Sequence, residues 1–320
     1  MRRKAETKII NGAPRTVGSS IHLNFKIPAF KPLIQLLLGM AIVLISPAMI
    51  FRLRPPRPPL SYFVENLWFY RDLEVDHAKE KLLPDASVEL IIDLGEDGPK
   101  KLYDRRDTLQ HIDYHRCWIS GMQRQYIVIG TQPGSSMMGA HFRTGGAAPF
   151  FGFPMSELTG TVVELDLIWK REILSLRDQL LEAPTIEAKF DLLEAYLLTK
   201  AQSRLQPDNT ISAALASLQS WPVIPLRELA SRLGVSHKKM IARFDCRVGL
   251  TPKFTSRLLR FRKSLAAAHG VAEPDWAAIA TEYGYYDQAH LIHEFQEFGG
   301  MSPSEYHQNR TIYPHYIPVG

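Results

Sequence analysis

One pattern of residues occurs twice in the last third of the chain. Each copy has an apolar residue followed by alanine, then a glycine, a phenylalanine, a second glycine, and a threonine or serine before proline. The first copy consists of Leu229-Ala230, Gly234, Phe244, Gly249 and Thr251-Pro252, and the second of Ile279-Ala280, Gly284, Phe295, Gly300 and Ser302-Pro303. The offset is 50 residues up to the first glycine and 51 residues after it. A spacing kept over so many landmarks predicts two copies of one supersecondary unit.

The first copy has the pattern of a helix, a turn and a second helix. Apolar residues at positions 226, 229, 230 and 233 have the spacing of a helix with one buried face. Gly234 can end that helix in a left-handed conformation, and Ser236 can cap the next helix, from about His237 to Cys246. Met240 and Phe244 lie four residues apart and are expected to be the buried pair of that second helix.

The second copy repeats this plan. Asp287 can cap its second helix, and Leu291 and Phe295 are the expected buried pair. The segment Ser302-Pro303-Ser304-Glu305 has the composition of a capping box, with proline at the first helical position. Each copy therefore predicts one helix-turn-helix unit.

The second helix of such a unit can enter the major groove of DNA, where its outward side chains meet the base edges. The residues expected to point outward, and so to read bases, are His237, Lys238, Ile241, Ala242, Gln288, Ala289 and His293. Gln288 is the best base reader among them, because a carboxamide can pair bidentately with adenine.

Positive charge is concentrated on the first unit. Residues 226 to 270 contain eleven Lys and Arg against two Asp and Glu, a net +9, whereas residues 271 to 320 contain one against seven, a net −6. We therefore predict that the first unit supplies most of the affinity for DNA. The candidates for phosphate contact are Ser236, Lys239, Arg243, Thr251, Lys253 and Arg257. Replacing Lys238 and Arg243 by alanine should weaken binding far more than replacing Gln288.

These residues resemble those of the AraC/XylS family of bacterial transcription regulators. The resemblance covers residues 211 to 308 and includes both glycines and both closing Thr/Ser-Pro helices of the repeat. It implies an all-α domain with two tandem helix-turn-helix units that binds double-stranded DNA. Family members often have arginine two residues before the phenylalanine of each second helix, where this chain has Ala242 and His293. A frequent partner of guanine is thus missing from both units.

The residues before this domain have the pattern of a mostly β fold. Between Pro55 and Gly152, short apolar runs such as SVELIIDLGEDG and QYIVIGT are broken by turn residues. Two helices are then predicted, from about Glu164 to Leu181 and from Ile186 to Arg204, with Thr185 as the cap of the second. The runs LPDASVELIIDLG and FRTGGAAPFFGFP also resemble the N-terminal domain of one AraC-type subgroup, whose effector the resemblance does not supply.

The expected fold class is therefore α+β. Residues 55–206 are predicted to form a β-rich N-terminal domain of the sensor or dimerisation type, closed by two helices. Residues 207–310 are predicted to form the all-α C-terminal domain with the two tandem helix-turn-helix units. Residues 1–54 are a basic and apolar leader, and residues 311–320 are a tail.

The leader contains an apolar stretch of 18 residues from Leu33 to Ile50, which has three interpretations. It lies upstream of the true start if translation begins at Met49. It is a buried or interfacial segment of the fold. Alternatively it is a membrane anchor, although its length barely spans a bilayer and it lies too far from Met1 for an ordinary signal peptide.

One cluster of residues could bind a metal. His111, Asp113, His115 and Cys117 alternate, so they would share one face of a strand. We favour a polar strand face instead, because no second pair of ligands with metal-site spacing occurs. The chain also lacks a phosphate-binding glycine loop and a nucleophile elbow, so we expect no catalytic residues, no cofactor, no metal and no enzyme.

The leading hypothesis is a cytoplasmic, sequence-specific transcription regulator. Its partner would be double-stranded DNA, with RNA polymerase as a further partner if it activates; a small-molecule effector and a homodimer stay open. One alternative is the same regulator tethered to a membrane by residues 33–50. The other is a β domain that binds a small molecule, with His141 as a pocket residue and a degenerate DNA-binding domain.

Overall fold

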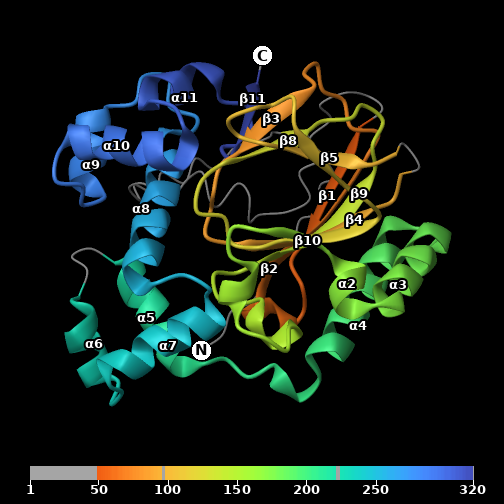
Figure 1. Ribbon diagram of the computed structural model, residues 1–320, viewed down its shortest axis with the longest axis horizontal. Coiled ribbons are helices and arrows are strands. Elements are labelled where there is room, and N and C mark those ends of the chain that lie inside the picture. Colours follow the sequence, from red (N-terminus) through yellow and green to blue (C-terminus); the bar gives the residue numbers. More distant parts are fainter. Residues whose placement is uncertain (1–48, 96–97, 221–223, 320) are drawn as a thin grey trace, which may run out of the picture. The chain divides into compact units, whose positions relative to one another are not determined.

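The computed structural model describes residues 49 to 95, 98 to 220 and 224 to 319 (Figure 1). The apolar stretch at 33–50 lies almost wholly outside these residues. In the described part of the chain, no helix combines the length and the hydropathy that crossing a membrane requires.

One of the two sheets of the β region is antiparallel and has six strands. Its order is β1 (Ile50–Arg54), β2 (Val64–Arg71), β9 (Met137–Phe142), β4 (Val88–Asp93), β7 (Cys117–Ser120) and β10 (Val162–Glu164). In β4 the alternating residues Val88, Leu90 and Ile92 are at most 4% exposed. Ile91 and Asp93, on the opposite face, are also buried, so both faces of this central strand are covered.

The other sheet of the β region is antiparallel and has five strands. Its order is β11 (Tyr316–Val319), β3 (Lys79–Leu82), β8 (Ile127–Gly130), β5 (Lys100–Tyr103) and β6 (His111–Tyr114). Single turns of 3-10 helix connect these strands and the helices that follow: η1 (Leu60–Tyr62), η2 (Ala148–Phe150), η3 (Met155–Leu158) and η4 (Gln202–Arg204). The predicted β-rich domain is therefore confirmed as two antiparallel sheets.

Three helices follow where the sequence predicts two. They are α2 (Leu165–Trp169), α3 (Arg171–Glu182) and α4 (Ile186–Ala201). The predicted helix from Glu164 to Leu181 is wrong as one element, because Lys170 adopts a positive φ of 55° and interrupts it. Thr185 caps α4 as predicted, since its side chain accepts a hydrogen bond from the backbone nitrogen of Ala188.

The C-terminal region is helical and contains both predicted units. Its helices are α5 (Asn209–Gln219), α6 (Leu226–Arg232), α7 (His237–Arg247), α8 (Pro252–Ala268), α9 (Trp276–Glu282), α10 (Gln288–Gly299) and α11 (Pro303–Asn309). Helices α6 and α7 form the first helix-turn-helix unit, and α9 and α10 form the second. The long helix α8 runs between the two units (Figure 1).

Two outer segments carry more structure than the sequence analysis assigns to them. The end of the leader, Ile50–Arg54, is strand β1 and pairs with β2. The tail contains β11, which pairs with β3, and its Ile317 is only 2% exposed. These corrections have one physical reason: a short strand is stabilised by the partner strand, which the local sequence does not reveal. The predicted boundary at 206/207 stays a prediction.

Candidate nucleic-acid interface

The helix α7 presents a short polar face to solvent. Gly234, with φ of 66°, ends α6, and the Ser236 side chain accepts a hydrogen bond from the backbone nitrogen of Lys239 at 3.2 Å. Met240 and Phe244 are fully buried, as the sequence predicts. Their burial turns the opposite face of α7 outward, so that the exposed side chains are Lys238, Lys239, Ile241 and Ala242, while His237 is half-buried.

The helix α10 repeats this arrangement in the second unit. Its cap is Asp287, which accepts a hydrogen bond from the backbone nitrogen of His290 at 2.8 Å. Leu291 and Phe295 are fully buried. The outward residues of α10 near its start are Gln288, Ala289, Ile292 and His293, all exposed.

Tyr286 is a candidate contact that the sequence analysis missed. This residue is 93% exposed, the largest exposure among the exposed large apolar residues of the described chain. It lies just before the cap of α10, beside the predicted base readers Gln288 and Ala289. The signal was the doubled tyrosine after Gly284, of which Tyr285 is buried and only Tyr286 projects outward.

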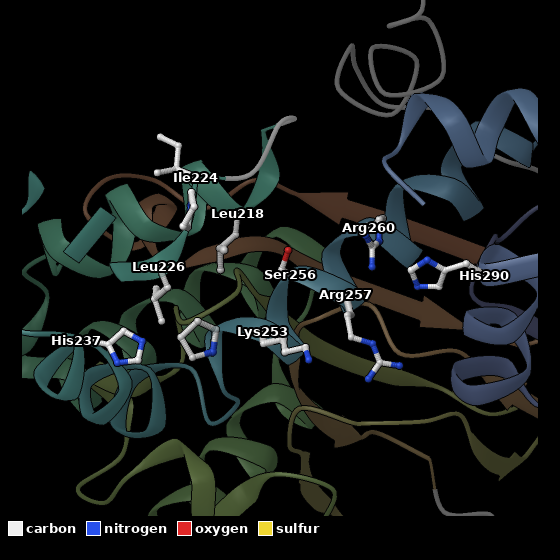
Figure 2. A pocket seen from close by; sticks show the side chains of 11 residues that line it. Leu218, Ile224, Leu226, His237, Lys253, Ser256, Arg257, Arg260 and His290 are labelled. Carbon is white, nitrogen blue, oxygen red and sulfur yellow. The ribbon is translucent and has the colours of Figure 1, made fainter. Parts of the chain in front are cut away.

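A groove of about 720 Å³ lies beside α8 and reaches both helix-turn-helix units (Figure 2). Its cationic and histidine side chains come from the start of α7, from α8 and from the start of α10: His237, Lys253, Arg257, Arg260 and His290. The remaining wall is formed by Leu218, Ile224, Pro225, Leu226, Pro252 and Ser256. The structure thus brings Lys253, Arg257 and Arg260 of α8 together with the first turns of α7 and α10, the second helices of the two units.

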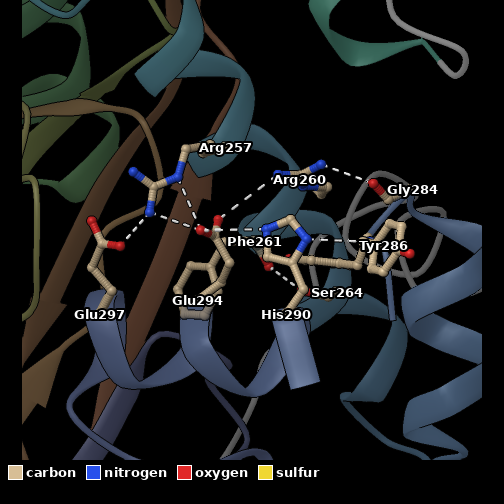
Figure 3. Close-up of polar contacts among 10 residues, drawn as sticks. Arg257, Arg260, Phe261, Ser264, Gly284, Tyr286, His290, Glu294 and Glu297 are labelled. Atoms are coloured by element: carbon tan, nitrogen blue, oxygen red, sulfur yellow. Dashed lines mark hydrogen bonds and ion pairs between the residues drawn. The ribbon is translucent and has the colours of Figure 1, made fainter. Parts of the chain in front are cut away.

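Two arginines in this groove are held by acidic residues of α10 (Figure 3). The Arg257 Nε and Nη2 atoms donate hydrogen bonds to Glu294 Oε1 at 2.9 and 2.7 Å, and Nη2 also donates to Glu297. Arg260 donates to the carbonyl oxygen of Gly284 at 2.9 Å and approaches Glu294 Oε2 at 3.9 Å. Burial alone would lower the pKa of Arg257, but the hydrogen bonds that Arg257 donates to Glu294 and Glu297 outweigh burial and raise it.

The other predicted phosphate contacts differ in their surroundings. Arg243 donates to Asp208 Oδ1 at 3.2 Å, so its guanidinium already has an anionic partner. Lys239 and Lys253 are exposed, and no ion pair forms at either one within the described residues. Ser236 and Thr251 are both helix caps, and their hydroxyl oxygens accept backbone N–H bonds. Only the two lysines therefore offer charge that the protein does not already neutralise.

The β region contacts both units at equivalent positions of the repeat. In the first unit, Thr159 Oγ1 donates to the carbonyl oxygen of Gly249 at 2.7 Å. In the second unit, Lys81 Nζ donates to the carbonyl oxygen of Gly300 at 3.3 Å, and the Gly300 backbone lies against the Tyr126 ring. Both second helices of the repeat are thus attached to the β region at their C-terminal ends.

The residues His111, Asp113, His115 and Cys117 do not form one metal-binding face. His111 and Asp113 lie on β6, whereas Cys117 lies on β7 after a turn with a positive φ at Arg116. Cys117 is 2% exposed, and burial raises the pKa of its thiol to about 12. The described residues contain no group of three His, Cys, Asp or Glu side chains that could hold a metal ion.

His141, the pocket residue of one alternative, is enclosed by carboxylates. Its Nδ1 lies 2.6 Å from Glu89 Oε2 and its Nε2 lies 3.5 Å from Asp85 Oδ2. Burial alone would lower the pKa of His141, but Glu89 and Asp85 outweigh it and raise the pKa to about 9. His141 is therefore a charged partner of two acids inside the β region.

Comparisons with known proteins cover both regions. Residues 229–309 match the model of a helix-turn-helix domain family, and residues 52–164 match the model of a domain of unknown function (DUF6597). No curated protein matches the chain.

Among solved structures, the chain is similar to ToxT from Vibrio cholerae. A 1.65 Å structure of ToxT is 9% identical, with a TM-score of 0.41 and coverage of 82% of this chain and 98% of ToxT. ToxT bound to an unsaturated fatty acid is 11% identical, with a TM-score of 0.40 and coverage of 82% and 95%.

Proposed function

Because residues 229–309 form an AraC-type helix-turn-helix domain, we propose that this protein is a sequence-specific transcription regulator in which the first unit supplies most of the affinity for DNA. The observation that carries this proposal is the pair of exposed helix starts on either side of one basic groove. Helices α7 and α10 would read bases in successive major grooves of the DNA. The cationic groove of the protein beside α8 would contact the DNA phosphates between these two sites.

The division of labour between the units follows from their free charge. The first unit offers Lys238 and Lys239 on α7, and Lys253 lies at the start of α8, directly after this unit; all three are exposed. In the second unit, the acidic residues Glu294 and Glu297 instead neutralise a cation of α8. Counterions are released only where a cation of the protein contacts a phosphate. Most of the affinity for DNA should therefore come from the first unit.

Base reading should be weak at the positions where the family often has arginine. Ala242 cannot donate a hydrogen bond, and His293 has no fork of donors for guanine. Gln288 at the start of α10 stays the best candidate for a base contact, and His237, Lys238, Ile241 and Ala289 surround the same two helix starts. Specificity would then depend on few direct contacts and on the spacing of the two units.

The two-sheet region would act as the sensor or dimerisation part of such a regulator. It holds both units through Gly249 and Gly300, so a change in this region would be transmitted to both reader helices. A regulator of this kind acts on DNA in the cytoplasm. A small-molecule effector, a second copy of the chain and, for an activator, RNA polymerase would be its other partners.

The proposal is tested by binding the full chain to genomic DNA fragments over a range of salt concentrations. A footprint that survives at physiological salt supports sequence-specific reading, whereas binding that disappears without a preferred fragment overturns it. Because Arg243 is paired with Asp208, the cleaner double variant is Lys239→Ala with Lys253→Ala, which removes the two exposed phosphate candidates. It should make the slope of log K against log salt less steep by about 2, since each phosphate contact contributes about 0.9.

Two comparisons control this result. Lys101→Ala with Arg106→Ala removes the same charge from exposed positions of the β region and should leave the slope unchanged. Gln288→Ala should weaken binding to the footprinted site but not to random DNA. Equal losses for the lysine pair and for Gln288→Ala on random DNA would contradict the assignment of affinity to the first unit.

A further inference from the structure

The carboxylates of Glu294 and Glu297 meet the same guanidinium but in different surroundings. The Glu294 side chain is 5% exposed and accepts two hydrogen bonds from Arg257. The Glu297 side chain is 43% exposed and contacts the same Arg257 from the solvent side. A buried carboxylate depends on its partner, whereas an exposed one can exchange its partner for water at small cost.

This difference assigns separate roles to the two acids. Glu294 also lies 3.9 Å from Arg260 and from His290, so it holds α10 against α8 from the inside. It is a positioning residue for the second unit. Glu297 adds no such burial, and its contact can break while the helix stays in place.

Arg257 lies where an anion would approach. It lines the groove with Lys253, and both lie between His237 and His290 (Figure 2). Glu294 holds the Arg257 guanidinium from the inside through Nε and Nη2. A phosphate that entered this groove would therefore compete with Glu297 for the solvent side of the guanidinium.

We propose that Glu297 is an electrostatic gate on the groove, which covers the solvent side of the Arg257 guanidinium in the free protein and yields it to a DNA phosphate. This inference rests on the proposed DNA-binding function. The gate lowers affinity for every sequence alike, because the contact it blocks is to the backbone and not to a base. Because the gate weakens this phosphate contact, a larger share of the total affinity for DNA must come from correct base contacts.

The test is the variant Glu297→Gln, with Glu273→Gln as its matched control. Both remove one negative charge from an exposed position of the acidic segment 271–320, but no contact joins Glu273 to Arg257 among the described residues. Affinity for a random-sequence duplex is measured at low salt on the full chain. Glu297→Gln should tighten binding about twofold to fivefold more than Glu273→Gln, the range of an exposed ion pair.

A double-mutant cycle identifies the cation. In the background of Arg257→Gln, the advantage of Glu297→Gln should disappear, because the gate no longer has a cation to cover. If circular dichroism shows that Arg257→Gln does not fold, the comparison of Glu297→Gln with Glu273→Gln alone tests the gate. Equal tightening by these two variants overturns the gate and leaves DNA binding intact. If neither the parent chain nor Glu297→Gln binds any duplex, the proposed function itself has failed.

Discussion

Gly249 lets us separate backbone strain from contact between the two regions. It ends α7 with φ of 88°, a conformation that costs a residue with a Cβ atom about 1 to 2 kcal/mol. A Cβ at this position would also lie 2.6 Å from Thr159 Oγ1 and 2.8 Å from the carbonyl oxygen of Met155. The hydroxyl can rotate away, but the carbonyl belongs to the backbone of η3, so the first unit must shift from the β region.

Gly234 is the matched control. Its φ is 66°, yet no atom lies within 4 Å of the Cβ that alanine would add. Gly234→Ala should therefore cost only the strain, about 1 to 2 kcal/mol. Gly249→Ala should cost that strain and about 1 to 3 kcal/mol of overpacking, about 2 to 5 kcal/mol in all.

Urea unfolding followed by circular dichroism measures both losses by linear extrapolation. The quantity of interest is the difference between the two variants, because the common strain cancels. A loss for Gly249→Ala no larger than that for Gly234→Ala would refute the reasoning. It would mean that η3 and the first unit can make room for the added methyl group without a loss of stability.

Two further predictions concern the tail and the β region. Ile317→Ala should lower the free energy of unfolding by about 2 to 4 kcal/mol, because Ile317 is 2% exposed. Ile312→Ala, at a residue that is 59% exposed, should change the free energy of unfolding by less than about 0.5 kcal/mol. Urea unfolding measures both values, and similar losses would contradict the burial of β11. His141 has a pKa of about 9, because Glu89 and Asp85 outweigh burial, so its stabilising effect is complete below its ordinary pKa of about 6.5 and is lost as the pH rises through about 9. The urea midpoint should fall over this range in the parent chain and stay level in His141→Asn.

The repeat could be predicted in detail because its signals are local. The side chains of Ser236, Asp287 and Ser302 each cap a helix through backbone groups a few residues away, as predicted. The burial of Phe244 and Phe295 follows from a spacing of four residues within one helix. Interactions over so few residues leave a readable pattern in the amino-acid order.

The β region was predicted only in outline. No glycine or proline at Lys170 marks the interruption of the predicted helix. The interruption occurs between α2 and α3, which both pack against β7. The strand β11 reads as a tail, because four residues with a proline carry no clear alternation. Its pairing with β3 depends on residues more than two hundred positions earlier.

Local patterns in the amino-acid order are enough to predict that two helix-turn-helix units follow a β-rich region, and which faces of their second helices are exposed. Which of the predicted cations are free depends instead on how the helices pack. Arg257 and Glu294 lie 37 residues apart on helices that the repeat places side by side, and Arg243 meets Asp208 in the same way across 35 residues. Periodicity specifies the face on which a charge lies, but the partner on that face is set by how the helices pack.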